Sequence, residues 1–102
     1  MVRFNVEDSF AVPQSSVIYA IVLAANIEET VTVPDYAKYV IFTSTANFWM
    51  KVNDDGVITV PVADDITGDA PELNPVNRAV VAGDILHLIA PAASTISIAF
   101  YS

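Results

Sequence analysis

Apolar and polar residues alternate along most of this chain, a pattern that is typical of β-strands with one buried and one exposed face. In the last stretch, for example, Ile96, Ile98 and Phe100 predict an inward row. Residues that favour turns, such as glycine, proline, asparagine and aspartate, separate the alternating segments. We expect strands at residues 2–6, 17–25, 28–33, 37–45, 47–53, 57–62, 85–90 and 95–101.

About seven or eight short strands at this spacing predict an all-β fold with helix content close to nil. The expected architecture is a single antiparallel β-sandwich, jelly-roll-like in its strand arrangement. Since one hydrophobic core commonly serves roughly 100–150 residues, we expect residues 1–102 to form one domain.

The longest apolar run in the chain is 17–25, which reads VIYAIVLAA. Ser15 or Ser16 would cap a helix here, so a helix is one alternative. The β-branched residues of the run, and the lack of a polar face at helical spacing, favour a strand that is buried on both faces. The run is far shorter than the ~20 residues that cross a bilayer, and no membrane contact is expected.

The segment 37–45 is also apolar on both sides. Val40 and Phe42 share one face, and Tyr39 and Ile41 share the opposite one. Either this strand lies between two layers of the protein, or one of its faces meets another molecule. We therefore take Tyr39 and Ile41 as interface candidates.

A β-hairpin is predicted between the segments 47–53 and 57–62, because the Asp-Asp-Gly sequence between them is a strong hairpin signal. Pro61 places the returning strand at a sheet edge, since proline cannot donate to a strand ladder. After this hairpin, residues 63–77 lose all strand periodicity, and loops of that length are usually functional or disordered.

The loop 63–77 is acidic and is the first candidate for chemistry. Asp64, Asp65, Asp69 and Glu72 are the residue types that bind Ca²⁺, but their spacing does not match an EF-hand loop. A solvated loop is the interpretation we favour. Paired carboxylates for glycoside hydrolysis are a weaker alternative, because no aromatic residues accompany them.

No other residues form a catalytic pattern. His87 is the only histidine and lies in an apolar segment, so we expect it to pack in a core or an interface. One imidazole cannot build a metal site of the kind that cupin enzymes use, and no Ser–His–Asp set is evident. Without cysteine there is no thiol nucleophile or Cys-bound zinc. We expect no enzyme activity, no cofactor and no metal.

Composition favours a protein that binds other proteins. Hydrophobic residues make up 54% of the chain and charged residues 16%, against about 45–50% and 25% in ordinary soluble domains. This excess predicts apolar surface for a partner or for further copies. The net charge of −8 argues against nucleic-acid binding. The N-terminus is a poor signal peptide, so we expect an unprocessed protein made in a cytoplasm.

Aromatic residues supply the remaining interface candidates. Alternation places Trp49 on the face opposite to Phe48 and Met50, and exposed tryptophan is enriched at binding hot spots. The alternative is that a loop or the N-terminal strand covers it. Tyr36 lies in a turn, and either Tyr36 or Trp49 would stack on sugar rings in a carbohydrate-binding module. Tyr101 is at the chain end, which we expect to be tied into a sheet or a neighbour.

Several stretches resemble small structural proteins of tailed bacteriophage virions. The resemblance covers residues 28–102, and its most specific pieces are ELNP at 72–75 followed by Arg78, and the closing IAFYS at 98–102. It implies a non-enzymatic virion component, most often a capsid decoration (cement) protein that binds and stabilises the shell. A head–tail or tail accessory protein, or a receptor-binding module, is the alternative.

The resemblance also implies partners and location. The partner would be the major capsid protein or another virion protein, and the chain would reside in the virion after synthesis in the host bacterial cytoplasm. Because oligomers are usually symmetric and decoration proteins often sit on symmetry axes, a homotrimer is expected. The resemblance carries over no active-site residues.

Overall fold

The computed structural model describes residues 14–53 and 56–102. Within these ranges the protein has eight strands and no helix, which confirms the predicted all-β class. The strand predicted at 2–6 lies outside the described residues. The strands are β1 (Val17–Leu23), β2 (Glu29–Thr32), β3 (Tyr39–Ser44), β4 (Trp49–Val52), β5 (Glu72–Leu73), β6 (Asn77–Ala79), β7 (Ile85–Ile89) and β8 (Ser94–Tyr101).

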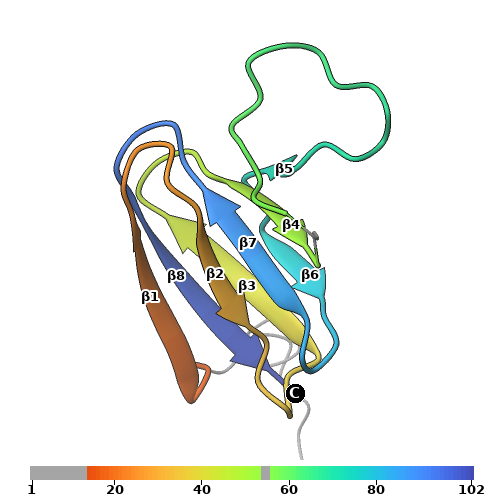
Figure 1. Cartoon of the computed structure of the whole chain (residues 1–102). Coiled ribbons are helices and arrows are strands. Elements are labelled where there is room, and N and C mark those ends of the chain that lie inside the picture. Colours follow the sequence, from red (N-terminus) through yellow and green to blue (C-terminus); the bar gives the residue numbers. More distant parts are fainter. Residues whose placement is uncertain (1–13, 54–55) are drawn as a thin grey trace, which may run out of the picture.

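The strands form two four-stranded sheets that face each other (Figure 1). The β8 sheet has the order β1-β8-β3-β6, and the β7 sheet has the order β2-β7-β4-β5. The pairs β1–β8, β2–β7, β3–β6 and β4–β5 are all antiparallel. The chain thus has the topology of one long antiparallel hairpin whose turn lies between β4 and β5. This hairpin is rolled up, so that the successive strand pairs belong alternately to the β8 sheet and to the β7 sheet. This is the jelly-roll sandwich that the strand pattern predicts.

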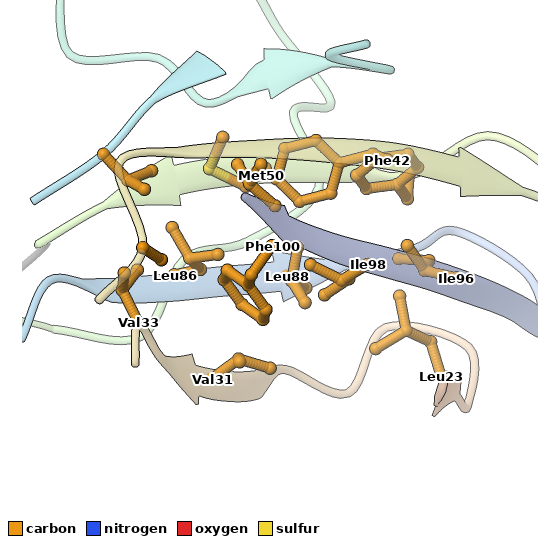
Figure 2. Close-up of a cluster of buried hydrophobic side chains, with 14 of the residues drawn as sticks. Leu23, Val31, Val33, Phe42, Met50, Leu86, Leu88, Ile96, Ile98 and Phe100 are labelled. Atoms are coloured by element: carbon orange, nitrogen blue, oxygen red, sulfur yellow. The ribbon is translucent and has the colours of Figure 1, made fainter. Parts of the chain in front are cut away.

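The core lies between the sheets and is built from the predicted inward rows. Ile96, Ile98 and Phe100 of β8 meet Leu86 and Leu88 of β7, and none of these side chains is more than 2% exposed. Figure 2 shows side chains from both sheets pointing into this single cluster. Burying one such side chain stabilises the fold by about 1.5–3 kcal/mol. The alternating strands therefore become stable only when the two sheets stack.

The first strand departs from its prediction in burial. β1 is a strand, but Leu23 is its only buried residue. It lies at the edge of the β8 sheet, and its outward residues Ile18 and Val22 are 44% and 71% exposed. The expectation of two buried faces is wrong because no described part of the chain forms a layer over the outer side of this sheet.

The predicted strand at 57–62 does not exist. These residues are not in a sheet, and β4 pairs with β5 instead. Asn53 ends β4 with a φ of 56°, a left-handed conformation that asparagine tolerates. Its side chain donates to Asp84 and accepts from the Ile85 N–H. This anchor ties the end of β4 to β7, and residues 56–71 form the wide loop at the upper right of Figure 1.

The segment 63–77, predicted as a structureless loop, contains β5 and the start of β6. Asn74 has a φ of 49° and joins β5 to β4. Its Oδ1 accepts from the Phe48 N–H at 2.9 Å, and its own N–H donates to the Phe48 carbonyl at 2.9 Å. The ELNP sequence therefore contains the two residues of β5 and the left-handed asparagine that follows them. A strand of two residues is too short to be recognised from alternating apolar and polar positions.

A candidate interaction face on the outer side of the β8 sheet

The outer side of the β8 sheet is an apolar surface that crosses all four strands. Ala79 of β6 stands opposite Tyr39 of β3, and Tyr39 stands opposite Tyr101 of β8. In the next row Ile41 stands opposite Ala99. Residues opposed in this way point to the same side of a sheet. We call this surface the outer apolar face. Its aliphatic and tyrosine residues are Ile18, Ala20, Val22, Tyr39, Ile41, Ala79, Ala99 and Tyr101, and the uncharged polar residues Thr43, Asn77, Thr95 and Ser97 point to the same side.

Charge distinguishes this face from the rest of the molecule. Its four strands contain one charged residue, Arg78, and no acidic residue. Because the chain carries a net charge of −8, repulsion between copies, or from another acidic protein, is weakest here. The acidic residues of the described chain all lie elsewhere: Glu28, Glu29, Asp35, Asp64, Asp65, Asp69, Glu72 and Asp84.

A hollow of about 320 Å³ opens in the outer apolar face beside β6. It forms because Ala79 and the short Asn77 stand opposite the larger Tyr39 and Ile41. Small-molecule pockets span about 300–1,000 Å³, so the hollow has room for a few inserted side chains or a small ligand. The lining residues are Tyr39, Ile41, Asn77, Arg78, Ala79 and Tyr101.

Arg78, on one side of the hollow, forms a bidentate salt bridge with Glu72. Arg78 Nε donates to Glu72 Oε1 at 2.9 Å, and a second guanidinium nitrogen donates to Oε2. These hydrogen bonds lower the pKa of Glu72 and raise the pKa of Arg78. The pair links the edge strand of one sheet to the edge strand of the other. Glu72 of the ELNP sequence and Arg78 thus brace one side of the sandwich.

Three of the interface candidates named from the sequence, Tyr39, Ile41 and Tyr101, come together in this hollow. The alternation in β3 was the signal for the first two. Sequence reasoning missed Ala79 and Asn77, because β6 is only three residues long and has no recognisable period. Of the two explanations for the apolar sides of β3, burial between two layers is wrong, since Tyr39 is 50% exposed.

The other two candidates, Trp49 and Tyr36, lie elsewhere. Trp49 is on the outer side of the β7 sheet, as alternation predicts, opposite Leu73 and Ile89. It is half-buried. Tyr36 lies in the turn between β2 and β3 and is 43% exposed. These two side chains come from different parts of the fold and do not line the hollow.

The start of the long loop covers part of the outer side of the β7 sheet. Ile58 is 4% exposed although it does not belong to the sandwich core. Glu28 Oε2 accepts from the Ile58 N–H at 2.6 Å, and Glu28 Oε1 lies 3.2 Å from His87 Nδ1. The two atoms are close, but His87 Nδ1 has no hydrogen-bond partner among the described residues. His87 is buried, as predicted, but under the loop and not in the core.

The tip of the long loop, residues 62–69, presents both acidic and apolar side chains. Val62 is 97% exposed and Ile66 is 95% exposed. Asp65 lies between these two residues in the sequence. Its Oδ1 accepts hydrogen bonds from the Thr67 hydroxyl at 2.7 Å and from the Thr67 N–H at 3.2 Å, and these bonds lower the pKa of Asp65. Lys51 Nζ donates to the Asp69 carbonyl at 2.7 Å. Local turns and a tether to β4 thus give the tip a defined shape.

Similarity to other proteins does not help to assign a function to the outer apolar face or the loop tip. Comparison of the chain with known protein families, with curated proteins and with solved structures found no match. In the described part of the chain, no three histidine, aspartate or glutamate side chains are grouped to hold a metal ion. The same residues include no helix that is long and apolar enough to cross a membrane.

Proposed function

We propose that this chain is a non-enzymatic structural protein of a tailed-bacteriophage virion, a capsid decoration protein that binds and stabilises the shell. The observation that carries the proposal is the outer apolar face, which is open, uncharged over most of its area and free of acidic residues. Its partner is the major capsid protein or another virion protein, and its location is the virion. No cofactor or nucleic acid takes part.

The chemistry of the face supports docking over catalysis. The residues that line the hollow include no histidine, aspartate or glutamate, and the one charged side chain among them, Arg78, is engaged by Glu72. Histidine, glutamate and aspartate are the side chains that most often act as general acids or bases, so the hollow lacks the commonest groups for that chemistry. Tyrosine is, however, among the residues that contribute most to protein–protein binding.

The fold and the composition agree with this proposal. Jelly rolls occur in viral capsid proteins and in lectins, although a fold alone does not fix a function. A decoration protein needs a rigid body with apolar contact area. This chain has a sandwich core and an apolar outer side, and it forms them without any disulfide, since it contains no cysteine.

Co-sedimentation with shells that lack the protein tests the proposal. Val22→Asp adds a carboxylate to an exposed position of the outer apolar face, on an edge strand. We expect it to weaken shell binding at least about tenfold, or about 1.4 kcal/mol, because the charge must be desolvated in the contact. Thr32→Asp is the matched control, since it adds the same charge to an exposed position on the edge strand of the other sheet.

Two results would contradict the proposal. One is the absence of co-sedimentation by the unchanged protein. The other is equal binding by the Val22→Asp and Thr32→Asp variants. Binding to tail or head–tail particles in place of shells would move the chain to the accessory proteins of the virion, with the same face as the contact.

The hollow favours a second candidate function, a carbohydrate-binding module. Tyr39 and Tyr101 stand opposite each other on adjacent strands and line one cavity, so that their rings are available to stack on a sugar. A glycan array separates the two functions. A decoration protein shows no sugar preference, whereas a carbohydrate-binding module gives a ranked set of glycans whose binding is lost in Tyr101→Ala.

A further inference from the structure

β1 differs from the other strands at the edges of the two sheets. The edge strands are β1 and β6 in one sheet and β2 and β5 in the other. Natural proteins protect such edges with short strands, charged side chains, proline or bulges, because the unpaired backbone groups of an edge are a template for another strand. β2, β5 and β6 have four, two and three residues, and each contains a charged residue: Glu29, Glu72 and Arg78.

β1 has none of these protective features. Its seven residues, VIYAIVL, include no charged residue and no proline, and each of them is paired in regular register with β8. Among the described strands, none pairs with the other edge of β1. β1 is therefore the edge of the sandwich that is best suited to accept an additional strand.

The backbone groups on the open edge of β1 belong to Ile18, Ala20 and Val22. In an antiparallel pair, residues that bond to each other alternate with residues whose N–H and C=O point to the opposite side. Thr95 of β8 bonds toward β3, because its carbonyl accepts from the Thr45 N–H at 3.0 Å. Val22, which stands opposite Thr95, therefore directs its N–H and C=O away from β8, and Ala20 and Ile18 do the same.

Side chains on the inner side of β1 are only partly covered. Tyr19 stands opposite the buried Ile98 and so lies on the core side of the sheet, where its ring packs on Phe100 with 5.1 Å between the ring centroids. Tyr19 is nevertheless 37% exposed, and Ile21 on the same side is half-buried. A further strand beside β1 would cover both side chains.

The sequence of β1 matches a second copy of itself. Two antiparallel β1 strands can be aligned with their Ala20 residues opposite each other. Ile18 of each copy then lies opposite Val22 of the other, so that the open backbone groups of the two strands meet. Tyr19 lies opposite Ile21 on the inner side, and pairs of an aromatic and a β-branched residue stabilise sheets. Every cross-strand pair is apolar, so no like charges meet although each chain carries a net charge of −8.

We propose that two copies of this chain pair through β1, antiparallel across a two-fold axis, so that their four-stranded β8 sheets join into one continuous sheet. The contact is isologous, as in the two-fold dimers that are the commonest symmetric oligomers. The inference goes beyond the proposed function and does not require a shell. Because the strand is added at the edge, the outer apolar faces of both copies stay open and become one surface.

Cysteine cross-linking tests the contact and its register. The protein contains no cysteine, so every disulfide reports an engineered position. Residues that bond to each other in an antiparallel pair have Cα atoms about 5.5 Å apart, within the ~4.4–6.8 Å that a disulfide spans. We expect Ala20→Cys to give a covalent homodimer under mild oxidation. Ile18→Cys is the matched control on the same strand and should link much less, because the two copies of residue 18 lie about 13 Å apart along the paired strands.

A mixture of two variants completes the cross-linking test. Ile18→Cys chains mixed with Val22→Cys chains should give a covalent heterodimer, since these positions face each other in the proposed register. Homodimer of Ile18→Cys as abundant as that of Ala20→Cys would overturn the inference, because it fits parallel strands or stacking of two outer faces. All three positions are exposed, so loss of folding is not expected, and circular dichroism checks it.

Proline at position 20 gives an independent measurement. The Ala20 N–H points to the open edge, so Ala20→Pro removes a donor of the proposed contact and leaves the bonds between β1 and β8 in place. Light scattering of the unsubstituted protein at micromolar concentration should give the mass of a dimer, and Ala20→Pro should give the mass of a monomer. Ala20→Ser keeps the N–H and is the control, which should remain a dimer.

Two results of the light-scattering experiment would overturn the inference. One is a monomeric mass for the unsubstituted protein at micromolar concentration. The other is a trimeric mass, the assembly that the phage resemblance implies. If Ala20→Pro does not fold, the cross-linking result alone decides. Because no shells are present in either experiment, the test of shell binding stays separate.

Discussion

At the scale of single residues, a few polar side chains decide how the strands are joined. Asn53 and Asn74 adopt left-handed conformations at the ends of β4 and β5, and their side chains bond to backbone groups of neighbouring segments. Glu28 bonds to the backbone of the long loop. Glu72 and Arg78 brace the edge of the sandwich. None of these roles follows from hydrophobic alternation, because each depends on one specific contact with another segment. The partner lies 26 to 32 residues away for Asn53, Asn74 and Glu28, and six residues away for Glu72 and Arg78.

The pair of Glu72 and Arg78 predicts a small pH-dependent contribution to stability. The hydrogen bonds from Arg78 depress the pKa of Glu72 in the folded state, so the contribution is present above the ordinary value of 4.5 and is lost as the pH falls through the depressed value. Both side chains are 43% exposed, so screening by solvent keeps the contribution small. We expect Glu72→Gln to be less stable than the unsubstituted protein near neutral pH, in urea unfolding.

The difference should shrink as the solution is acidified below pH 4.5, because the unsubstituted protein then loses the ion pair as well. It should also shrink at high salt, since exposed charges are screened. A stability difference that is the same at neutral and acidic pH would mean that Glu72 acts through packing and not through its charge. Glu29→Gln, on the exposed β2 strand, controls for the change in net charge.

At the scale of elements, the strands that sequence reasoning predicted well are those with a long alternating period. β3, β7 and β8 have inward and outward rows as expected, because one face of each lies against the opposite sheet. The segment 57–62 was predicted as a strand because a strong turn signal preceded it. The competing interaction is the pairing of β4 with β5, which Asn74 secures from a position more than twenty residues away.

The start of the long loop functions as a cover for the β7 sheet, and Ile58 is the residue that anchors it. We expect Ile58→Ala to destabilise the protein by about 2–3 kcal/mol, because it removes a buried side chain and leaves a cavity. Val57→Ala, next to it but 73% exposed, should change stability by less than about 0.5 kcal/mol. Urea unfolding of the two variants measures the difference, and equal stabilities would show that the loop does not pack on the sheet.

At the scale of the whole molecule, the two outer sides of the sandwich differ in kind. The β7 sheet is partly covered by the chain's own loop. No described residue forms a layer over the β8 sheet, whose strands are largely apolar and contain no acidic residue. Composition predicted surplus apolar surface but not its location. The alternation of apolar and polar residues in β3 predicted that Tyr39 and Ile41 lie on its outer side. The hollow between these residues and β6 depends on how the two strands are aligned, which the sequence does not reveal. Trp49, the most conspicuous residue of the sequence, lies on the opposite sheet.

Hydroxyl-radical labelling of Tyr39 and Trp49, read by mass spectrometry, tests most directly the claim that the outer apolar face is the docking surface. Tyr39 is half-exposed on the β8 sheet and Trp49 is partly exposed on the β7 sheet, so each reports one outer side. Between the dilute free chain and the shell-bound chain, we predict that labelling of Tyr39 falls several-fold while labelling of Trp49 stays the same. Unchanged labelling of Tyr39, or protection of Trp49 alone, would contradict the account.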